Sequence, residues 1–151
     1  MHGLLTEKPG PDELVAKYQI SEGWSSSYLA KMGYKNLSGF ITLKGDSSFT
    51  AEDVPACCLH GADETVEPFS GGYYSFSGTW SIQKSSAVYV ISLSIAHIAG
   101  DGVPSDAELN KYFLSRVPHK TREVHIMEGK PLSVGFPVFN GDFIDIEFTR
   151  K

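Results

Sequence analysis

Apolar and polar residues alternate with a period of two along most of the chain, which is typical of β-strands with one buried face. The clearest case lies within residues 73–83. One face there would carry Tyr74, Phe76, Gly78, Trp80 and Ile82, and the other Ser75, Ser77, Thr79, Ser81 and Gln83. We therefore expect a strand with one apolar face and one hydroxyl-rich face.

A second strand is predicted over residues 87–98, where one face would carry Tyr89, Ile91, Leu93, Ile95 and His97. The connection at Lys84–Ser86 is short, so the two strands are predicted to form a hairpin.

The C-terminal third is predicted to form a meander of three strands, over residues 122–128, 131–139 and 142–150. Asn140-Gly141 between two apolar runs is a strong hairpin signal. Pro137 lies inside the middle strand and cannot donate to a ladder, which predicts an edge position or a bulge. Asp145 and Glu147 fall on the polar face of the last strand, so we expect them to be solvated rather than a glycosidase-type carboxylate pair.

The first half of the chain is predicted to hold a short strand within residues 13–20 and a hairpin within 39–54 that turns at Gly45–Ser47. Trp24, Tyr28 and Met32 recur every four residues and predict a helix that ends at Gly33. A second helix is predicted over residues 105–114, with Ser105 and Glu108 at capping-box spacing.

Seven or eight consecutive antiparallel strands leave sheet edges that must be paired or covered, and closure of the sheet removes those edges. We therefore predict an all-β fold, an antiparallel up-and-down barrel of about eight strands with one or two short helices. A two-sheet sandwich is the alternative. Residues 1–11 are predicted to be a flexible leader, and residues 12–151 a single barrel domain.

This strand order resembles the lipocalin and calycin barrels, including bacterial lipocalin-like domains. Those proteins begin with a Gly-x-Trp strand and often carry a basic residue on the last strand that packs over the Trp. In this chain Ala16-Lys17-Tyr18 stands in the place of Gly-x-Trp, and Arg150 ends the last strand. Two anchor positions are therefore substituted, and an intact Gly78-Thr79-Trp80 occurs only in mid-chain. The resemblance implies a barrel whose interior takes an apolar ligand.

Charge and hydropathy exclude several classes of function. A net charge of −5 and a pI near 5.5 argue against nucleic acid as a partner. The one short basic cluster, Arg116 to Arg122, is interpreted as a solvated loop. No apolar run reaches the roughly 18 residues of a membrane span. The absence of a signal peptide predicts a cytoplasmic protein, and an exported or lipid-anchored envelope protein if a signal sequence preceded the polar leader.

The pair Cys57-Cys58, within the segment 55–60, is the first candidate for chemistry. On an extended chain adjacent side chains point to opposite faces, so the two thiols would not hold one metal ion together. We expect one cysteine to pack in the core and the other to lie near the surface, at the end of a strand. A metal site that includes His60, and a redox-active or disulfide-forming pair, are the alternatives.

Aromatic residues make up 12% of the chain, and a barrel would place many of them on its inner wall. We expect a non-enzymatic protein that binds a small, partly apolar ligand, without cofactor or metal, as a monomer or weak homodimer. The predicted cavity wall is Tyr74, Phe76, Trp80, Tyr89, Leu93, His97, His125 and Phe136.

Two other functions stay open. The first is a protein-interaction module that presents loop 55–72 and helix 105–114. The second is a small enzyme with a His97/His125 or Cys58/His60 site. No catalytic residue is assigned, because the chain has no nucleophile elbow, phosphate loop or dinucleotide fingerprint.

Overall fold

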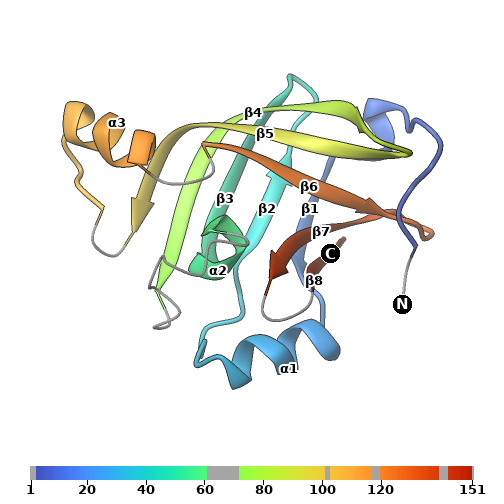
Figure 1. The fold of residues 1–151 in the computed structure, drawn as a ribbon, viewed down its shortest axis with the longest axis horizontal. Coiled ribbons are helices and arrows are strands. Elements are labelled where there is room, and N and C mark those ends of the chain that lie inside the picture. Colours follow the sequence, from blue (N-terminus) through green and yellow to red (C-terminus); the bar gives the residue numbers. More distant parts are fainter. Residues whose placement is uncertain (1–2, 61–71, 101–102, 117–119, 140–142, 151) are drawn as a thin grey trace.

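A computed structural model describes residues 3–60, 72–100, 103–116, 120–139 and 143–150 of the chain. Within them eight antiparallel strands follow one another in sequence order and close into a barrel (Figure 1). The strands are β1 (Ala16–Ile20), β2 (Phe40–Leu43), β3 (Ser48–Pro55), β4 (Tyr73–Ser85), β5 (Val88–Gly100), β6 (Thr121–Met127), β7 (Ser133–Phe139) and β8 (Phe143–Arg150). The predicted up-and-down barrel is confirmed, and the two-sheet sandwich is not.

Closure comes from pairing between the first and last strands. β1 pairs with β8 through Tyr18 and Arg150, Gln19 and Thr149, and Ile20 and Phe148. Every strand of the barrel therefore pairs with a strand on each side, and closure leaves none of the eight as an edge strand.

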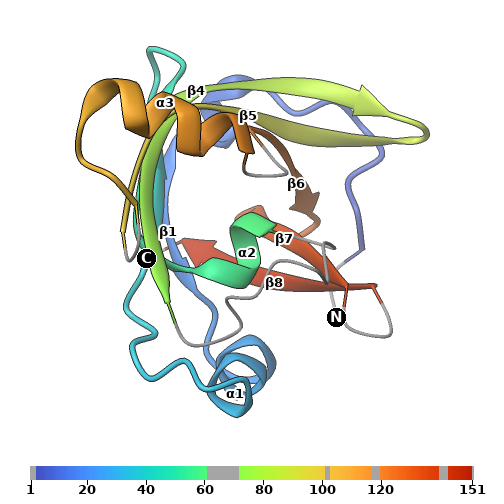
Figure 2. The ribbon, with the colours of Figure 1, turned by 60° about the vertical axis from the view of Figure 1, so that its left-hand side comes forward.

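The helices gather at one end of this barrel. In the described residues, α1 (Trp24–Lys31) connects β1 to β2, α2 (Ala56–His60) follows β3, and α3 (Ala107–Arg116) precedes β6. In an up-and-down barrel every second connection lies at the same end, which we call the helical end (Figures 1 and 2). The short turns after β2, β4 and β6 and the 3₁₀ helix η1 (Pro11–Glu13) belong to the opposite end. None of the described helices is long and apolar enough to span a membrane.

The predicted hairpin turns are confirmed. β2 and β3 pair on either side of residues 44–47, and β4 and β5 pair on either side of residues 86–87. Ser47 and Ser86 take positive φ angles of 70° and 54° in these turns. The predicted turn at Asn140-Gly141 lies outside the described residues.

The first predicted helix is confirmed as α1. Trp24 is 58% exposed and stacks on Tyr28 with ring centroids 5.2 Å apart, whereas Ser25 and Leu29 are the buried residues of α1. The helix ends as predicted, since Gly33 has a φ of 101° and the next residue, Tyr34, donates its backbone N–H to Leu29 O.

The second predicted helix is α3, and its cap is Asp106 rather than Ser105. The Asp106 carboxylate accepts the backbone N–H groups of Glu108 and Leu109, at 3.0 and 3.1 Å. The Asp106 side chain thus meets two of the N–H groups that lack partners at the start of a helix. Buried Asn110 then anchors α3 to the barrel by donating to Ile98 O of β5.

A register shift in β5 breaks the predicted alternation. Ser77 pairs with His97, but the next residue, Gly78, pairs with Ile95, so Ala96 is an extra residue on β5. A bulge of this kind reverses the facing of every later residue on its strand. Ile98 is therefore buried and His97 is exposed, although the alternation placed His97 inside.

Pro137 lies in β7, between β6 and β8 in the closed barrel. Pairing of β6 with β7 begins at His125 and Gly135, so Pro137 lies beyond the end of that ladder. The ring therefore removes no donor from a β6–β7 ladder bond. The predicted leader is in contact with the barrel at Leu5, whose backbone N–H donates to Ile126 O of β6 and whose carbonyl accepts from Tyr89 of β5.

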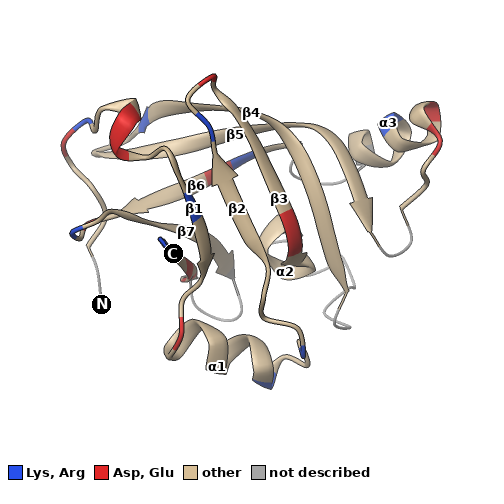
Figure 3. Cartoon of the chain, turned by 180° about the vertical axis from the view of Figure 1, so that it is seen from behind, with Lys and Arg blue, Asp and Glu red and all other residues tan. Residues whose placement is uncertain are grey.

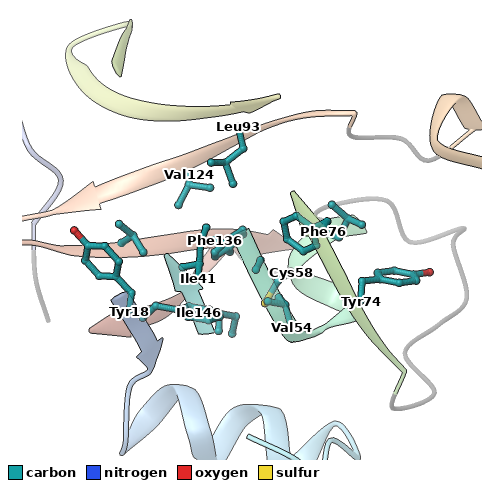
Figure 4. Packing of buried hydrophobic residues seen from close by; sticks show 14 of the residues in the cluster. Tyr18, Ile41, Val54, Cys58, Tyr74, Phe76, Leu93, Val124, Phe136 and Ile146 are labelled. Atoms are coloured by element: carbon teal, nitrogen blue, oxygen red, sulfur yellow. The ribbon is translucent and has the colours of Figure 1, made fainter. Parts of the chain in front are cut away.

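The contact that the lipocalin resemblance implies is present with tyrosine in place of tryptophan. The Arg150 guanidinium lies over the Tyr18 ring, 5.7 Å from its centroid. Tyr18 is fully buried and its hydroxyl donates to Leu14 O at 2.7 Å (Figure 4). Burial raises the pKa of Tyr18, and the charge of Arg150 opposes that change.

The close approach of β4 and β5 at the bulge can be tested at Gly78. A Cβ atom there would lie 1.8 Å from Ser94 O, which is backbone and has no room to move. We expect Gly78→Ala to lower the free energy of unfolding by about 2 kcal/mol or more. Urea denaturation followed by circular dichroism would measure the loss.

The matched control for this variant is Gly45→Ala, because a Cβ atom at Gly45 meets nothing within 4 Å. We expect that change to stay within about 0.5 kcal/mol. Equal stabilities of the two variants would show that β4 and β5 do not approach at Gly78.

Candidate functional site

Apart from Arg122 on β6, the inner wall of the barrel is built mainly from apolar side chains. Of the predicted wall residues, Phe76, Leu93 and Phe136 are buried to 98% or more and belong to one continuous core (Figure 4). Aliphatic side chains of β2, β5, β6 and β7 meet at what we call the aliphatic seam, namely Ile41, Leu43, Ile91, Leu93, Val124 and Val134. The seam has no polar lining, and the space between its side chains is too narrow to hold a water molecule.

Three other predicted wall residues, Trp80, Tyr74 and Tyr89, lie at different levels along the barrel. Trp80 is buried, and its indole N–H donates to Lys44 O at 3.0 Å, in the turn between β2 and β3. Tyr74 is buried towards the helical end, where its ring meets Phe113 of α3 edge to face at 6.5 Å. Tyr89 is half-buried against the core. The aromatic residues therefore span the barrel rather than surround one point.

The two predicted wall histidines do not meet inside the barrel. His97 is exposed because of the bulge. His125 lies on the outer side of β6, with Nδ1 2.7 Å from Asp145 Oδ1 of β8. The pair passes over Gly135 of β7, where a Cβ atom would lie 3.0 Å from the Asp145 Cβ.

The polar face of β8 is bonded rather than merely solvated, which corrects the prediction for Asp145 and Glu147. The Ser133 hydroxyl donates to Glu147 Oε2 at 2.5 Å, while Asp145 holds His125. These bonds tie the outer faces of β6, β7 and β8 together. They also occupy both carboxylates with partners on neighbouring strands.

The predicted strand end at Cys57 and Cys58 is wrong, because this segment is the helix α2. Both cysteines are free thiols and both are fully buried, so neither lies near the surface. Successive side chains of a helix are about 100° apart, not opposite, so two neighbours can face the core together. In the described residues α2 contacts β7, β3 and β4, so it covers part of the helical end (Figure 2).

Arg122 is a cation inside the barrel beneath α2. The charged residues of both signs are spread along the ribbon (Figure 3), yet Arg122 is only 6% exposed. Its Nε donates to Cys58 O at 3.0 Å, and its Nη2 donates to Pro137 O. Burial lowers the pKa of Arg122, and its electrostatic interactions with Cys58 and Asp145 oppose the change.

Sequence reasoning missed Arg122 by placing it in a solvated basic loop. A signal was present, because Arg122, Val124 and Ile126 alternate and therefore share one face of β6. All three are buried. The positive charge of Arg122 favours a solvated position, whereas its place in the alternating pattern indicates a buried one.

Tyr34 completes the cluster from the side of α1. Its hydroxyl oxygen accepts the backbone N–H of Cys57 at 3.1 Å, and its burial raises the pKa of the phenol. A hydrogen bond from the Cys58 thiol lowers the pKa of Cys57, with smaller contributions in the same direction from Tyr34 and Arg122. Burial, followed by the interaction with Cys57, raises the pKa of Cys58.

The four residues Cys57, Cys58, Tyr34 and Arg122 form what we call the α2 cluster. It combines two adjacent thiols, a phenol and a guanidinium, all at least 94% buried. The part of the chain that the structure describes contains no group of three His, Cys, Asp or Glu residues arranged to hold a metal ion. The chemistry available to the cluster is therefore that of a dithiol beside a positive charge.

The role of Arg122 in holding α2 can be measured. Arg122→Met keeps the apolar stem but leaves Cys58 O and Pro137 O without their donor. We expect the free energy of unfolding to fall by roughly 2–4 kcal/mol, because each unpaired buried acceptor is costly. Lys120→Met, at an exposed position two residues earlier, is the control. A similar small effect of both variants would contradict the role of Arg122.

No protein-family model, no curated protein and no solved structure matches this chain. The function is therefore argued from the barrel and from its buried residues.

Proposed function

We propose that the barrel binds a small, partly apolar molecule in its interior without chemical conversion. The observation that supports this proposal is the largely apolar inner wall of a closed barrel, with the aliphatic seam at Leu93 and Val124. Eight-stranded barrels are just wide enough to be filled by side chains or to hold one small ligand.

The aliphatic seam restricts the ligand. Its side chains leave no room for a water molecule, so a slender apolar group enters only if the lining side chains change rotamer. Each Å² of apolar ligand surface that leaves water contributes about 25 cal/mol. An apolar group is favoured there, because the side chains of the seam offer no hydrogen-bond partner.

The ligand is expected to approach from the helical end. At the opposite end Leu14 is fully buried beneath η1 and bonded to the Tyr18 hydroxyl. At the helical end the cover includes α2, a helix of five residues. We expect displacement of this one short helix to cost less than separation of two strands, because it leaves the closed sheet intact.

Decanol and decanoic acid are suitable probes, measured by native mass spectrometry and by titration calorimetry. We expect saturable binding of at least one probe, and at least a tenfold loss of affinity in Leu93→Phe, which places a larger ring in the aliphatic seam. Ser94→Ala changes the next, exposed residue of β5 and is expected to bind like the unchanged chain. Circular dichroism would establish that both variants fold.

Two results would count against ligand binding in the interior. One is the absence of binding by either probe. The other is binding that Leu93→Phe leaves unchanged, since the probe would then occupy another part of the surface.

A second function, protein interaction through α3, is favoured by a separate observation. Leu109 and Tyr112 lie three residues apart on one helix face and are 55% and 61% exposed. Apolar pairs at this spacing are used when a helix docks into a groove. Of the predicted interaction loop 55–72, residues 55–59 are buried in β3 and α2 and do not present a surface, and residues 61–71 lie outside the described residues. A partner that is retained by the unchanged chain and lost with Leu109→Ser would support this function.

A further inference from the structure

The α2 cluster contains a reactive arrangement that ligand binding does not use. Cys57 and Cys58 are neighbours in sequence, lie on the same short helix, and are both fully buried as free thiols. A buried guanidinium is bonded to the backbone of the same residues, through Cys58 O. Apolar packing alone would be served equally well by alanine or valine at either position.

We propose that Cys57 and Cys58 are a reversible redox pair, which hydrogen peroxide oxidises to a disulfide between adjacent residues, and that this disulfide displaces α2 from the barrel end.

Cys57 is the attacking thiol. The pKa of Cys57 is lowered by Cys58, against the opposing effect of burial, with smaller contributions from Tyr34 and the charge of Arg122. This shift favours the thiolate, which is the nucleophilic form. The Cys57 sulfur attacks one peroxide oxygen, the O–O bond breaks, and water leaves after protonation, so that Cys57 becomes a sulfenic acid. The Cys58 sulfur then attacks the Cys57 sulfur, the S–OH bond breaks, and a second water leaves. In total two thiols and one peroxide give one disulfide and two waters.

The disulfide is incompatible with α2 in its helical form. Adjacent Cα atoms across a trans peptide are about 3.8 Å apart, whereas disulfide-linked Cα atoms are usually separated by about 4.4–6.8 Å. The linking peptide must therefore leave helical geometry for the bond to form. Because strained disulfides are readily reduced, the same strain makes the oxidation reversible by small thiols.

Distortion at this peptide acts directly on the bonds that hold α2. The carbonyl of Cys58 accepts from Arg122 Nε, and the N–H of Cys57 donates to the Tyr34 hydroxyl. The N–H of Cys57 and the carbonyl of Cys58 lie on either side of the peptide bond that must change conformation. Loss of these two bonds releases α2 from β6 and from the α1 side of the barrel end.

The first experiment treats the folded chain with hydrogen peroxide and then alkylates it. We expect the unchanged chain to lose two alkylatable thiols and about 2 Da of mass, and to recover both with dithiothreitol. Cys57→Ser and Cys58→Ser remain monomeric and cannot close the ring, so Cys58→Ser should gain about 16 Da as a sulfenic acid at Cys57. Intact thiols after treatment of the folded chain, with oxidation only in urea, would overturn the proposal. A disulfide between two chains would also overturn it.

The second experiment measures displacement of α2 by amide hydrogen exchange. We expect exchange at residues 56–59 to rise at least tenfold in the oxidised chain, while exchange at residues 91–95 of β5 stays unchanged. Arg122→Lys, which keeps the charge, is expected to oxidise and still show this rise. A disulfide that forms without any change at residues 56–59 would overturn the displacement.

The consequence for ligand entry rests on the proposed function and is tested apart from it. If decanol binds the reduced chain, oxidation is expected to increase its association rate several-fold. If decanol binds neither form, ligand binding in the interior fails while the thiol chemistry and the displacement of α2 stand on their own measurements.

Discussion

Pairing of β1 with β8 is the constraint on which the rest of the molecule depends. Three residue pairs, centred on Gln19 and Thr149, turn an eight-stranded meander into a closed surface. Closure gives the inner face a continuous apolar wall, because each buried strand face then meets others across the interior. Closure also leaves the two ends as the places where covering elements are needed, and the helices and η1 occupy them.

Arg122 supplies a hydrogen-bond donor to a backbone carbonyl of the closed sheet, that of Pro137. The β6–β7 ladder stops at Gly135, so the carbonyl of Pro137 has no strand partner on that side. The guanidinium supplies the missing donor and reaches α2 with its second bond. One buried cation therefore connects β6, β7 and α2, and its charge also favours the thiolate of Cys57. The same side chain therefore supports both the closed sheet and the cover of the helical end.

Local patterns predicted the strands and turns well, because strand alternation and turn chemistry depend on near neighbours. They failed where a distant contact decided the outcome. The bulge at Ala96 lies where Gly78 of β4 approaches Ser94 of the neighbouring strand β5. The residue pattern within β5 does not predict it. His97 was misplaced for that reason. α1 was predicted from Trp24 and Tyr28, yet the helix buries Ser25 and Leu29, since the orientation of a short helix is chosen by the surface that it covers.

The amino-acid sequence by itself determined the number and order of the strands, the main turns, and an apolar wall that includes Phe76, Leu93 and Phe136. It did so because these features follow from alternation, glycine and polar turn residues close together in the chain. Only the tertiary structure decided that Cys57 and Cys58 lie on a helix, that both are buried, and that Arg122 lies beneath them. A five-residue helix is too short to be stable alone, so packing against the barrel end determines it.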